Sequence, residues 1–249
     1  MTDWPTGYGR RVLDEVDSTL DEAARIAPTL TGPEWILARR QTKGRGRRGR
    51  AWTDPSGNFA GTLVYRPEGR PDQIALRSFI AALALYDAVE TVTGRSRGLA
   101  LKWPNDVLLN GGKLAGILLE SASSKDGVAY LSIGIGVNLC ETPMKEWLEP
   151  GAVWPVSLLS EMGMKVEPET FLEALATAFA TYEDQFTTYG FDPIRTAWLS
   201  RAAKLGEVIT ARTAREEISG TFETIDGSGN LVLTTAQGAV TIPAADIFF

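Results

Sequence analysis

Apolar and polar positions follow two different periods along the chain up to about residue 202. Short apolar runs bounded by turn residues are typical of strands, whereas apolar residues three and four positions apart are typical of amphipathic helices. Strands are expected at residues 35–38, 62–65, 99–103 and 128–137. Helices are expected at residues 17–27, 71–94, 169–189 and 193–202, the first with a capping pattern in which Asp17-Ser18-Thr19 precedes Glu22. The two kinds of segment together predict an α+β fold.

Two apolar runs, residues 107–109 and 114–119, flank the tripeptide Asn110-Gly111-Gly112. An Asn-Gly pair tolerates the positive φ angles of a tight turn between antiparallel strands. The sequence therefore predicts a β-hairpin in this region.

From about residue 204 the pattern changes to short apolar segments separated by turns such as residues 226–229. The apolar segments lie at residues 208–210, 218–222, 231–233 and 240–242. Short strands at close spacing predict a small all-β module of the size of an SH3 barrel. We therefore expect two domains, residues 1–203 and residues 204–249.

Composition excludes several kinds of chemistry. The 249 residues, 44% of them hydrophobic, can bury one substantial core plus a small appended domain. Because its net charge is −6, the molecule as a whole is not expected to bind nucleic acid or an anionic membrane surface. The chain has no histidine and one cysteine, Cys140, which excludes histidine metal sites, a Ser-His-Asp triad and an internal disulfide framework. Because no apolar run approaches ~18 residues and the N-terminus resembles no signal peptide, we expect a cytoplasmic protein that does not span a membrane.

Residues 39–50, RRQTKGRGRRGR, concentrate positive charge on an otherwise acidic chain. They hold seven of the 25 basic residues and none of the 31 acidic ones. Their three glycines disfavour helix and strand and their like charges repel, so the isolated segment is expected to be mobile until an anion neutralises it. From the segment alone three interpretations stay open: a solvated loop, an arginine-rich contact to nucleic acid, and a clamp on a phosphate or carboxylate.

Two lysines interrupt apolar strands on either side of an Asn105-Asp106 pair. Lys102 lies within the first strand, and Lys113 begins the strand after the hairpin turn. One such lysine is usually at a strand edge or extends its ammonium group to water, and Asp106 alone can cap the turn after Pro104. An ammonium group near a core costs several kcal/mol unless an anion meets it, so two of them on consecutive strands suggest one shared anionic ligand.

Small residues lie where a ligand could approach these strands. Gly116 lies on the same strand face as Leu114 and leaves room for a ligand or another backbone. Gly134 and Gly136 share one strand face and predict a flat floor without side chains, although a single Gly-x-Gly is a weak signal. At the end of that strand, Asn138 offers an amide that could contact a base edge.

Four motifs occur together in the order of one known family. They are GRGRRGRAW at residues 44–52, KWPND at residues 102–106, KLAGIL at residues 113–118 and GIGVN at residues 134–138. With Asp17-Ser18-Thr19, Gln41 and the C-terminal β module, the chain resembles the biotin protein ligase family over nearly its whole length.

The resemblance implies a fold and a domain organisation. The fold is a mixed central β-sheet flanked by helices, related to class II aminoacyl-tRNA synthetases, followed by a small C-terminal SH3-like β-barrel. Only about 17 residues precede the Ser-Thr motif, so the chain is expected to be of the monofunctional type, without the N-terminal DNA-binding domain of the larger members.

The resemblance also assigns residues to roles. The residues expected to bind biotin are Ser18, Thr19, Leu20, Gln41, Arg45, Gly46, Arg47, Lys113 and Gly116. The residues expected to bind ATP are Arg47, Arg50, Trp52, Lys102, Asn105, Lys113 and Asn138. The residues expected to act in catalysis are Arg47, Lys102, Asp106 and Lys113. Leu20 stands where the family often has Asn, which puts a polar contact there in doubt.

The implied reaction joins biotin and ATP to form biotinyl-5′-AMP and then transfers biotin to a lysine of a biotin carboxyl carrier protein or domain. Mg²⁺ is the implied ion, and its ligands stay open. Cations already in place reduce the repulsion between a carboxylate and the α-phosphate, so no protein nucleophile is needed. Asp106 would accept a proton from the incoming amine or orient it.

Two alternatives and one open question remain. The nearest alternative is a lipoate or octanoyl ligase or transferase, but a linear acyl chain needs no polar pocket for a ureido ring. A nucleic-acid-binding protein is disfavoured because the rest of the chain is acidic and residues 39–50 contain no aromatic side chain for base stacking. A homodimer and a monomer are both open.

Overall fold

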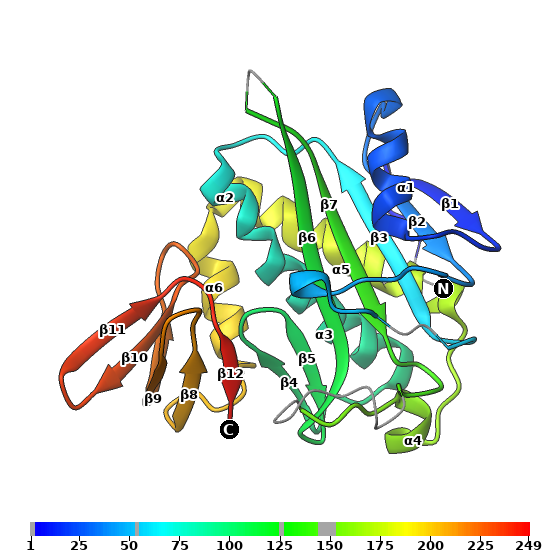
Figure 1. Cartoon of the computed structure of the whole chain (residues 1–249). Coiled ribbons are helices and arrows are strands. Elements are labelled where there is room, and N and C mark those ends of the chain that lie inside the picture. Colours follow the sequence, from blue (N-terminus) through cyan, green and yellow to red (C-terminus); the bar gives the residue numbers. More distant parts are fainter. Residues whose placement is uncertain (1–2, 53–54, 125–126, 144–152) are drawn as a thin grey trace.

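Two β-sheets carry the fold of the protein (Figure 1). The structure is a computed structural model, and it describes residues 3–52, 55–124, 127–143 and 153–249. Within these residues the larger sheet has seven strands in the order β1-β2-β3-β7-β6-β5-β4, and the smaller has five in the order β11-β10-β9-β8-β12.

The larger sheet is mixed, as the family resemblance implies. Its strands are β1 (Gly9–Leu13), β2 (Glu34–Ala38), β3 (Phe59–Tyr65), β4 (Leu99–Lys102), β5 (Asp106–Leu109), β6 (Gly112–Ser124) and β7 (Gly127–Val137). β1 runs parallel to β2, and every other neighbouring pair is antiparallel. The predicted strands and the hairpin between β5 and β6 are confirmed. β1 was not predicted, because this exposed edge strand lacks a run of apolar residues.

The helices are α1 (Thr19–Ile26), α2 (Pro71–Ala75), α3 (Arg77–Thr93), α4 (Leu158–Met162), α5 (Pro168–Tyr189) and α6 (Phe191–Leu199), with 3₁₀ turns η1 (Ala27–Thr29) and η2 (Arg47–Gly49). The helix expected over residues 71–94 is divided at Leu76 into α2 and α3. The short helix α4 was not predicted. Within the described part of the chain, no helix is both long enough and apolar enough to cross a bilayer.

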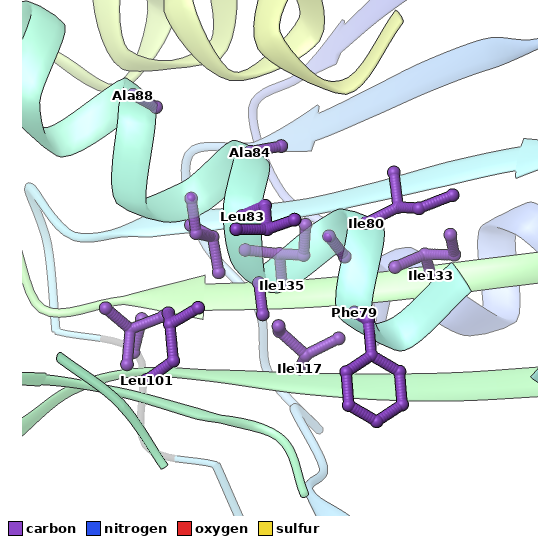
Figure 2. Close-up of a cluster of buried hydrophobic side chains, with 14 of the residues drawn as sticks. Phe79, Ile80, Leu83, Ala84, Ala88, Leu101, Ile117, Ile133 and Ile135 are labelled. Carbon is purple, nitrogen blue, oxygen red and sulfur yellow. The ribbon is translucent and has the colours of Figure 1, made fainter. Parts of the chain in front are cut away.

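Helices α3 and α5 cover one face of the larger sheet, and the main hydrophobic core lies between them and the strands (Figures 1 and 2). Leu83 of α3 meets Ile117 of β6 and Ile133 and Ile135 of β7 in this core. Each such fully buried side chain stabilises the fold by about 1.5–3 kcal/mol. Successive side chains of a strand point to opposite faces, so Gly134 and Gly136 must lie on the other face of β7. The core therefore leaves that other face available for a site.

The smaller sheet is antiparallel throughout. Its strands are β8 (Val208–Arg212), β9 (Glu217–Ile225), β10 (Leu231–Thr235), β11 (Gly238–Ile242) and β12 (Asp246–Phe248). A small all-β domain is confirmed, with β11 and β12 at opposite edges of its described sheet rather than paired to close a barrel. β12 was not predicted, and it brings the end of the chain back toward the larger sheet (Figure 1).

Backbone hydrogen bonds join β4 of the larger sheet to the segment that leads from α6 into the smaller sheet. Leu101 N donates to Arg201 O at 2.8 Å, and Ala203 N donates to Leu101 O at 2.8 Å. The Trp103 indole Nε1 donates to Gly229 O at 3.1 Å, which ties the KWPND motif to a turn of the smaller sheet. The smaller sheet is therefore held beside the strand that carries Lys102.

Candidate ligand-binding site

One cavity of about 560 Å³ lies on the face of the larger sheet opposite α3 and α5. All fifteen residues assigned to the site from the sequence line it: Ser18, Thr19, Leu20, Gln41, Arg45, Gly46, Arg47, Arg50, Trp52, Lys102, Asn105, Asp106, Lys113, Gly116 and Asn138. The lining also includes Arg212, Asp246 and Phe248 from the smaller sheet, which the sequence did not point to. Residues from both sheets therefore enclose the cavity.

The floor of the cavity is built from glycines because other side chains rest on it. A Cβ atom at Gly134 would lie 2.9 Å from the side chain of Leu20, and a Cβ atom at Gly136 would overlap the indole ring of Trp52. At Gly116 a Cβ atom would lie 3.2 Å from the same ring. The prediction of a floor without side chains is therefore wrong in one respect, since Leu20 and Trp52 cover it. Leu20 makes an apolar contact here, in line with the doubt about a polar one.

Strand register gathers the charged residues. In the ladder, Lys102 of β4 is paired with Asp106 of β5, and Asp106 is paired with Gly116 of β6. The Lys113 Nζ lies 2.7 Å from Asp106 Oδ1, and the Lys102 Nζ lies 3.7 Å from Asp106 Oδ2. β5 lies between the two lysine-bearing strands, so the expectation that these strands are consecutive is wrong. Asp106 is an ion-pair partner of both lysines, not only a turn residue.

Lys102 carries the cost of burying a charge. Only 9% of the residue is exposed, and burial lowers the pKa of Lys102 from its ordinary value, with Asp106 opposing that shift. Desolvation, together with the neighbouring Lys113 ammonium, thus outweighs the carboxylates of Asp106, at 3.7 Å, and Asp246. An anionic ligand in the cavity would supply the missing compensation.

The arginine-rich segment forms a compact loop over the sheet, where η2 lies in front of β6 (Figure 1). Gly46 N donates to Arg50 O at 2.7 Å, and Trp52 N donates to Gly44 O at 2.9 Å. The φ angle of 73° at Gly49 is one that glycine adopts without strain. These bonds give the segment a local structure that composition alone did not predict.

Asp246 of β12 gathers three arginines of this loop. Its carboxylate lies 2.5 Å from Arg48 Nη1, 3.4 Å from Arg50 Nη2 and 3.9 Å from Arg47 Nη1. Arg47 Nη1 also donates to Asn105 Oδ1 at 3.3 Å, and burial lowers the pKa of Arg47. The segment was expected to order only when an anion neutralises it. In this structure the Asp246 carboxylate of the smaller sheet is that anion.

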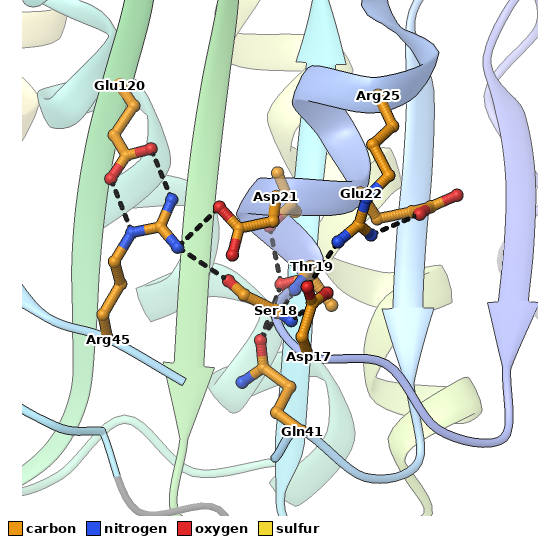
Figure 3. Close-up of polar contacts among 10 residues, drawn as sticks. Asp17, Ser18, Thr19, Asp21, Glu22, Arg25, Gln41, Arg45 and Glu120 are labelled. Atoms are coloured by element: carbon orange, nitrogen blue, oxygen red, sulfur yellow. Dashed lines mark hydrogen bonds and ion pairs between the residues drawn. The ribbon is translucent and has the colours of Figure 1, made fainter. Parts of the chain in front are cut away.

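Arg45 contacts two protein carboxylates, those of Glu120 and Asp21 (Figure 3). Its Nε and Nη2 donate to the two oxygens of Glu120 at 2.9 and 2.8 Å, and its Nη1 lies 2.8 Å from Asp21 Oδ1. These partners, Glu120 first, raise the pKa of Arg45. Although Arg45 lines the cavity, its charge is already neutralised by the protein.

The capping pattern predicted at the start of α1 does not form as expected. Ser18 occupies the N-cap position, but its side chain makes no capping hydrogen bond. Its Oγ accepts from Arg45 Nη1 at 3.3 Å instead, while Glu22 pairs with Arg25 (Figure 3). Ser18 is therefore turned toward the cavity, and the arginine loop is connected to the first turn of α1.

At the end of the cavity formed by Ser18, Thr19 and Gln41, here called the neutral end, hydrogen bonds join uncharged polar groups. Gln41 Oε1 accepts from Thr19 N at 2.9 Å and from Thr19 Oγ1 at 3.1 Å (Figure 3). Thr62 Oγ1 donates to Thr19 Oγ1 at 2.8 Å. Ser18 and Thr19 are both buried. This end of the cavity presents neutral polar groups, and the Arg45 guanidinium beside Ser18 is already paired with two protein carboxylates.

Asn138 holds neighbouring backbone in place. Its N donates to Leu114 O at 2.9 Å, and its Nδ2 donates to Val156 O at 3.1 Å. The amide nitrogen thus helps to fix the backbone beside β6. Any contact from this side chain to an adenine amino group would fall to its Oδ1, which is an acceptor.

The donor set does not favour a metal ion held by the protein alone. Among the described residues no three His, Cys, Asp or Glu side chains cluster closely enough to hold one. Mg²⁺ commonly binds through one or two carboxylates together with substrate phosphates and water. In the cavity, Asp106 and Asn105 offer side-chain oxygens, and Asp106 is already paired with both lysines.

Comparisons with known proteins agree with this architecture. Residues 10–138 match the model of the biotin/lipoate A/B protein ligase family, and residues 204–249 match the biotin protein ligase C terminal domain. A biotin–[acetyl-CoA-carboxylase] ligase of Paracoccus denitrificans is 57% identical, over 96% of this chain and 99% of that protein. The bifunctional ligase/repressor BirA of Bacillus subtilis is 32% identical, over 95% of this chain and 73% of its own.

Among solved structures, the biotin protein ligase from Aquifex aeolicus in complex with biotin and ATP has a TM-score of 0.79 at 26% identity, covering 96% of this chain and 97% of that one. The chain belongs to the biotin/lipoate A/B protein ligase family. The resemblance to biotin protein ligases predicted from the motifs is confirmed over both sheets.

Proposed function

We propose that this protein converts biotin and ATP into biotinyl-5′-AMP and pyrophosphate, and then transfers biotin to a lysine of a carboxylase carrier domain. The observation that supports this most directly is that Arg47, Lys102 and Lys113 converge on one cavity that also has a neutral polar end. The names of the relatives, and the biotin and ATP bound to the Aquifex aeolicus protein, favour biotin over lipoate as the acid.

The end of the cavity that carries Arg47, Lys102 and Lys113, here called the charged end, suits the first half-reaction. A biotin carboxylate and the α-phosphate repel each other, and cations fixed in place lower that repulsion and stabilise the charge that spreads over the phosphate oxygens. Lys113 would touch both groups; its Nζ lies near Gly116 of the floor, 3.5 Å from where a Cβ atom of that residue would be. Lys102, Asn105, Arg47 and Arg50 would face the phosphates. Mg²⁺ would enter with ATP and reduce the charge of the phosphates.

The neutral end suits the fused rings of biotin. Ser18, Thr19 and Gln41 would hydrogen-bond the ureido group, while Leu20 and Trp52 supply apolar contact. Gly46 and Arg47, in the loop that crosses the cavity, would limit the escape and hydrolysis of the mixed anhydride. Trp52 and Asn138 would lie near the nucleotide.

In the second half-reaction a lysine amine of the acceptor attacks the anhydride carbonyl, which forms an amide bond and releases AMP. The amine must lose a proton to react, and its ordinary pKa is about 10.4. Asp106 is the carboxylate nearest to Lys113, at 2.7 Å, and would accept that proton or orient the amine. The acceptor would be a biotin carboxyl carrier protein or domain.

Three further assignments belong to this proposal. The catalytic domain would comprise residues 1–203 and the C-terminal domain residues 204–249. The protein would act in the cytoplasm, consistent with its single cysteine. It would have no DNA partner, since the chain outside residues 39–50 is strongly acidic.

A labelling assay tests the proposal. Purified protein would be incubated with ATP, Mg²⁺, radiolabelled biotin and a biotin carboxyl carrier domain, and the carrier would be analysed for covalent label. We expect ATP-dependent labelling that disappears when the acceptor lysine is replaced by arginine. A parallel reaction with labelled lipoate and a lipoyl domain should give none. Labelling by lipoate alone would overturn the proposal.

A further inference from the structure

Thr62 of β3 is a polar side chain in the fold that the proposed function has not used. It is 0% exposed and is not among the residues that line the cavity. In the ladder it lies between Ile36 of β2 and Gly134 of β7, on the sheet face that carries the cavity. Its hydroxyl donates to Thr19 Oγ1 at 2.8 Å, so it reaches the neutral end from beneath.

The order of donors and acceptors in this chain of hydrogen bonds is fixed by one backbone group. The Thr19 N–H can only donate, and it lies 2.9 Å from Gln41 Oε1, which must therefore be the oxygen of the amide. Because an amide oxygen cannot donate, the Thr19 hydroxyl must give its proton to the same atom, at 3.1 Å. Thr19 Oγ1 is then an acceptor toward Thr62, whose hydroxyl is the donor.

This arrangement leaves Thr19 with a defined rotamer and a defined proton. Thr19 is itself 3% exposed, so water has little access to its hydroxyl. Without the Thr62 hydroxyl, a buried lone pair on Thr19 would lose its donor, which costs about 1–3 kcal/mol or drives the hydroxyl to another position. Either outcome disturbs the bond to Gln41.

We propose that Thr62 is a positioning residue for biotin: from below the cavity floor, it orients the Thr19 hydroxyl and through it the Gln41 amide that meet the ring end of the ligand. This inference rests on the proposed function. Thr62 touches neither substrate, and the charged end does not depend on it. Its loss should therefore weaken binding of biotin and leave binding of ATP nearly unchanged.

The test compares two substitutions at Thr62 with a matched one nearby. Thr62→Val keeps the shape and the strand preference of the side chain but removes the hydroxyl, and Thr62→Ser keeps the hydroxyl. Ser132→Ala is the control, because Ser132 lies on the adjacent strand β7, is 1% exposed, and its Oγ has no hydrogen-bond partner within the described chain. Biotin-dependent ATP–pyrophosphate exchange gives the KM of each substrate and the kcat.

We expect Thr62→Val to raise the KM for biotin about tenfold, in keeping with the loss of one buried hydrogen bond, while the KM for ATP stays within about twofold. Thr62→Ser should return the KM for biotin to within about threefold of wild type, and Ser132→Ala should change neither constant. Thermal melting checks that each variant is folded. Thr62→Ala serves as a second variant without the hydroxyl should Thr62→Val fail to fold.

The outcomes separate this inference from the proposed function. If wild type supports exchange but Thr62→Val and Thr62→Ala have the wild-type KM for biotin, Thr62 has no positioning role. An equal rise in the KM of both substrates, or no recovery in Thr62→Ser, would show a general structural effect and overturn the inference. If wild type gives no biotin-dependent exchange at all, the proposed function falls and this inference falls with it.

Discussion

The two ends of the cavity are built in different ways. At the neutral end, Thr62, Thr19 and Gln41 bond to one another in a single donor order. At the charged end, cations lie against carboxylates of the protein, as Lys113 does against Asp106. The first arrangement is complete before any ligand enters. At the charged end, the positive groups are held in position by carboxylates of the protein, and an anionic ligand must compete with those carboxylates.

This difference has an energetic consequence. Polar groups at the neutral end already hold one another in place, so a ring system can bind there with little reorganisation. At the charged end, burial lowers the pKa of Lys102 even with Asp106 nearby, so part of the cost of the buried charge is still uncompensated. Binding of a phosphate should therefore stabilise the charged end more than binding of biotin stabilises the neutral end.

The largest expected effect comes from removing the lysine at the centre of the charged end. Lys113→Ala should lower the rate of biotin-dependent pyrophosphate exchange by about 100- to 1,000-fold, the loss typical for one preorganised group that stabilises transition-state charge. The fold should persist, because the Lys113 side chain is 30% exposed and Asp106 keeps Lys102 as a partner. Exchange near the wild-type rate would remove Lys113 from the mechanism and with it the distinction between the two ends.

The sequence predicted the members of both ends better than their connections. Local patterns identified the strands that carry Lys102, Gly116 and Gly134, and the motifs identified fifteen of the residues that line the cavity. Which residues lie abreast depends on pairing between strands, and no local pattern specifies that Lys102 and Gly116 both pair with Asp106. The arginine loop was expected to lack structure for the same reason, since its partners lie elsewhere in the chain.

Asp246 shows this limit most clearly. It lies on a three-residue strand with no recognisable motif, and its partner Arg48 is 198 residues away in the sequence. Thr62 shows a second reason why the sequence was not sufficient, because a threonine in a strand is ordinarily explained by its preference for β-structure alone. Its functional meaning depends on a hydroxyl contact that only the packing of α1 against β3 creates.

An effect of intermediate size is expected on the rate of proteolysis when Asp246, whose carboxylate pairs with three arginines of the loop, is replaced. In Asp246→Asn, three arginines lose their shared anion, so trypsin should cleave the ligand-free protein within residues 45–50 about two- to fivefold faster. Biotin with ATP should restore protection, because phosphate would replace the carboxylate. Asp192→Asn is the matched control, since Asp192 lies on α6 and pairs only locally with Arg195 in the described chain. Equal cleavage of both variants would show that Asp246 does not hold the loop.

The smallest expected effect is on the free energy of unfolding, and it tests whether the buried charge of Lys102 is fully compensated in the ligand-free protein. Because the pKa of Lys102 is lowered in the folded protein, the unfolded chain binds more protons between that lowered pKa and the ordinary value of 10.5. The contribution of Lys102 to the free energy of unfolding therefore rises with pH in this window and is least favourable at neutral pH. Lys102→Met should thus be neutral to stabilising, by up to about 1 kcal/mol at pH 7.

Calorimetric melting with and without ATP checks this prediction. The advantage of Lys102→Met over wild type should shrink as the pH approaches 10.5, and ATP should raise the melting temperature of wild type more than that of the variant. Lys204→Met is the control, because Lys204 lies over the same Phe249 ring at 5.8 Å but is more exposed. Marked destabilisation by Lys102→Met at neutral pH would mean that Asp106 fully compensates the charge. The two ends of the cavity would then be equally complete without a ligand.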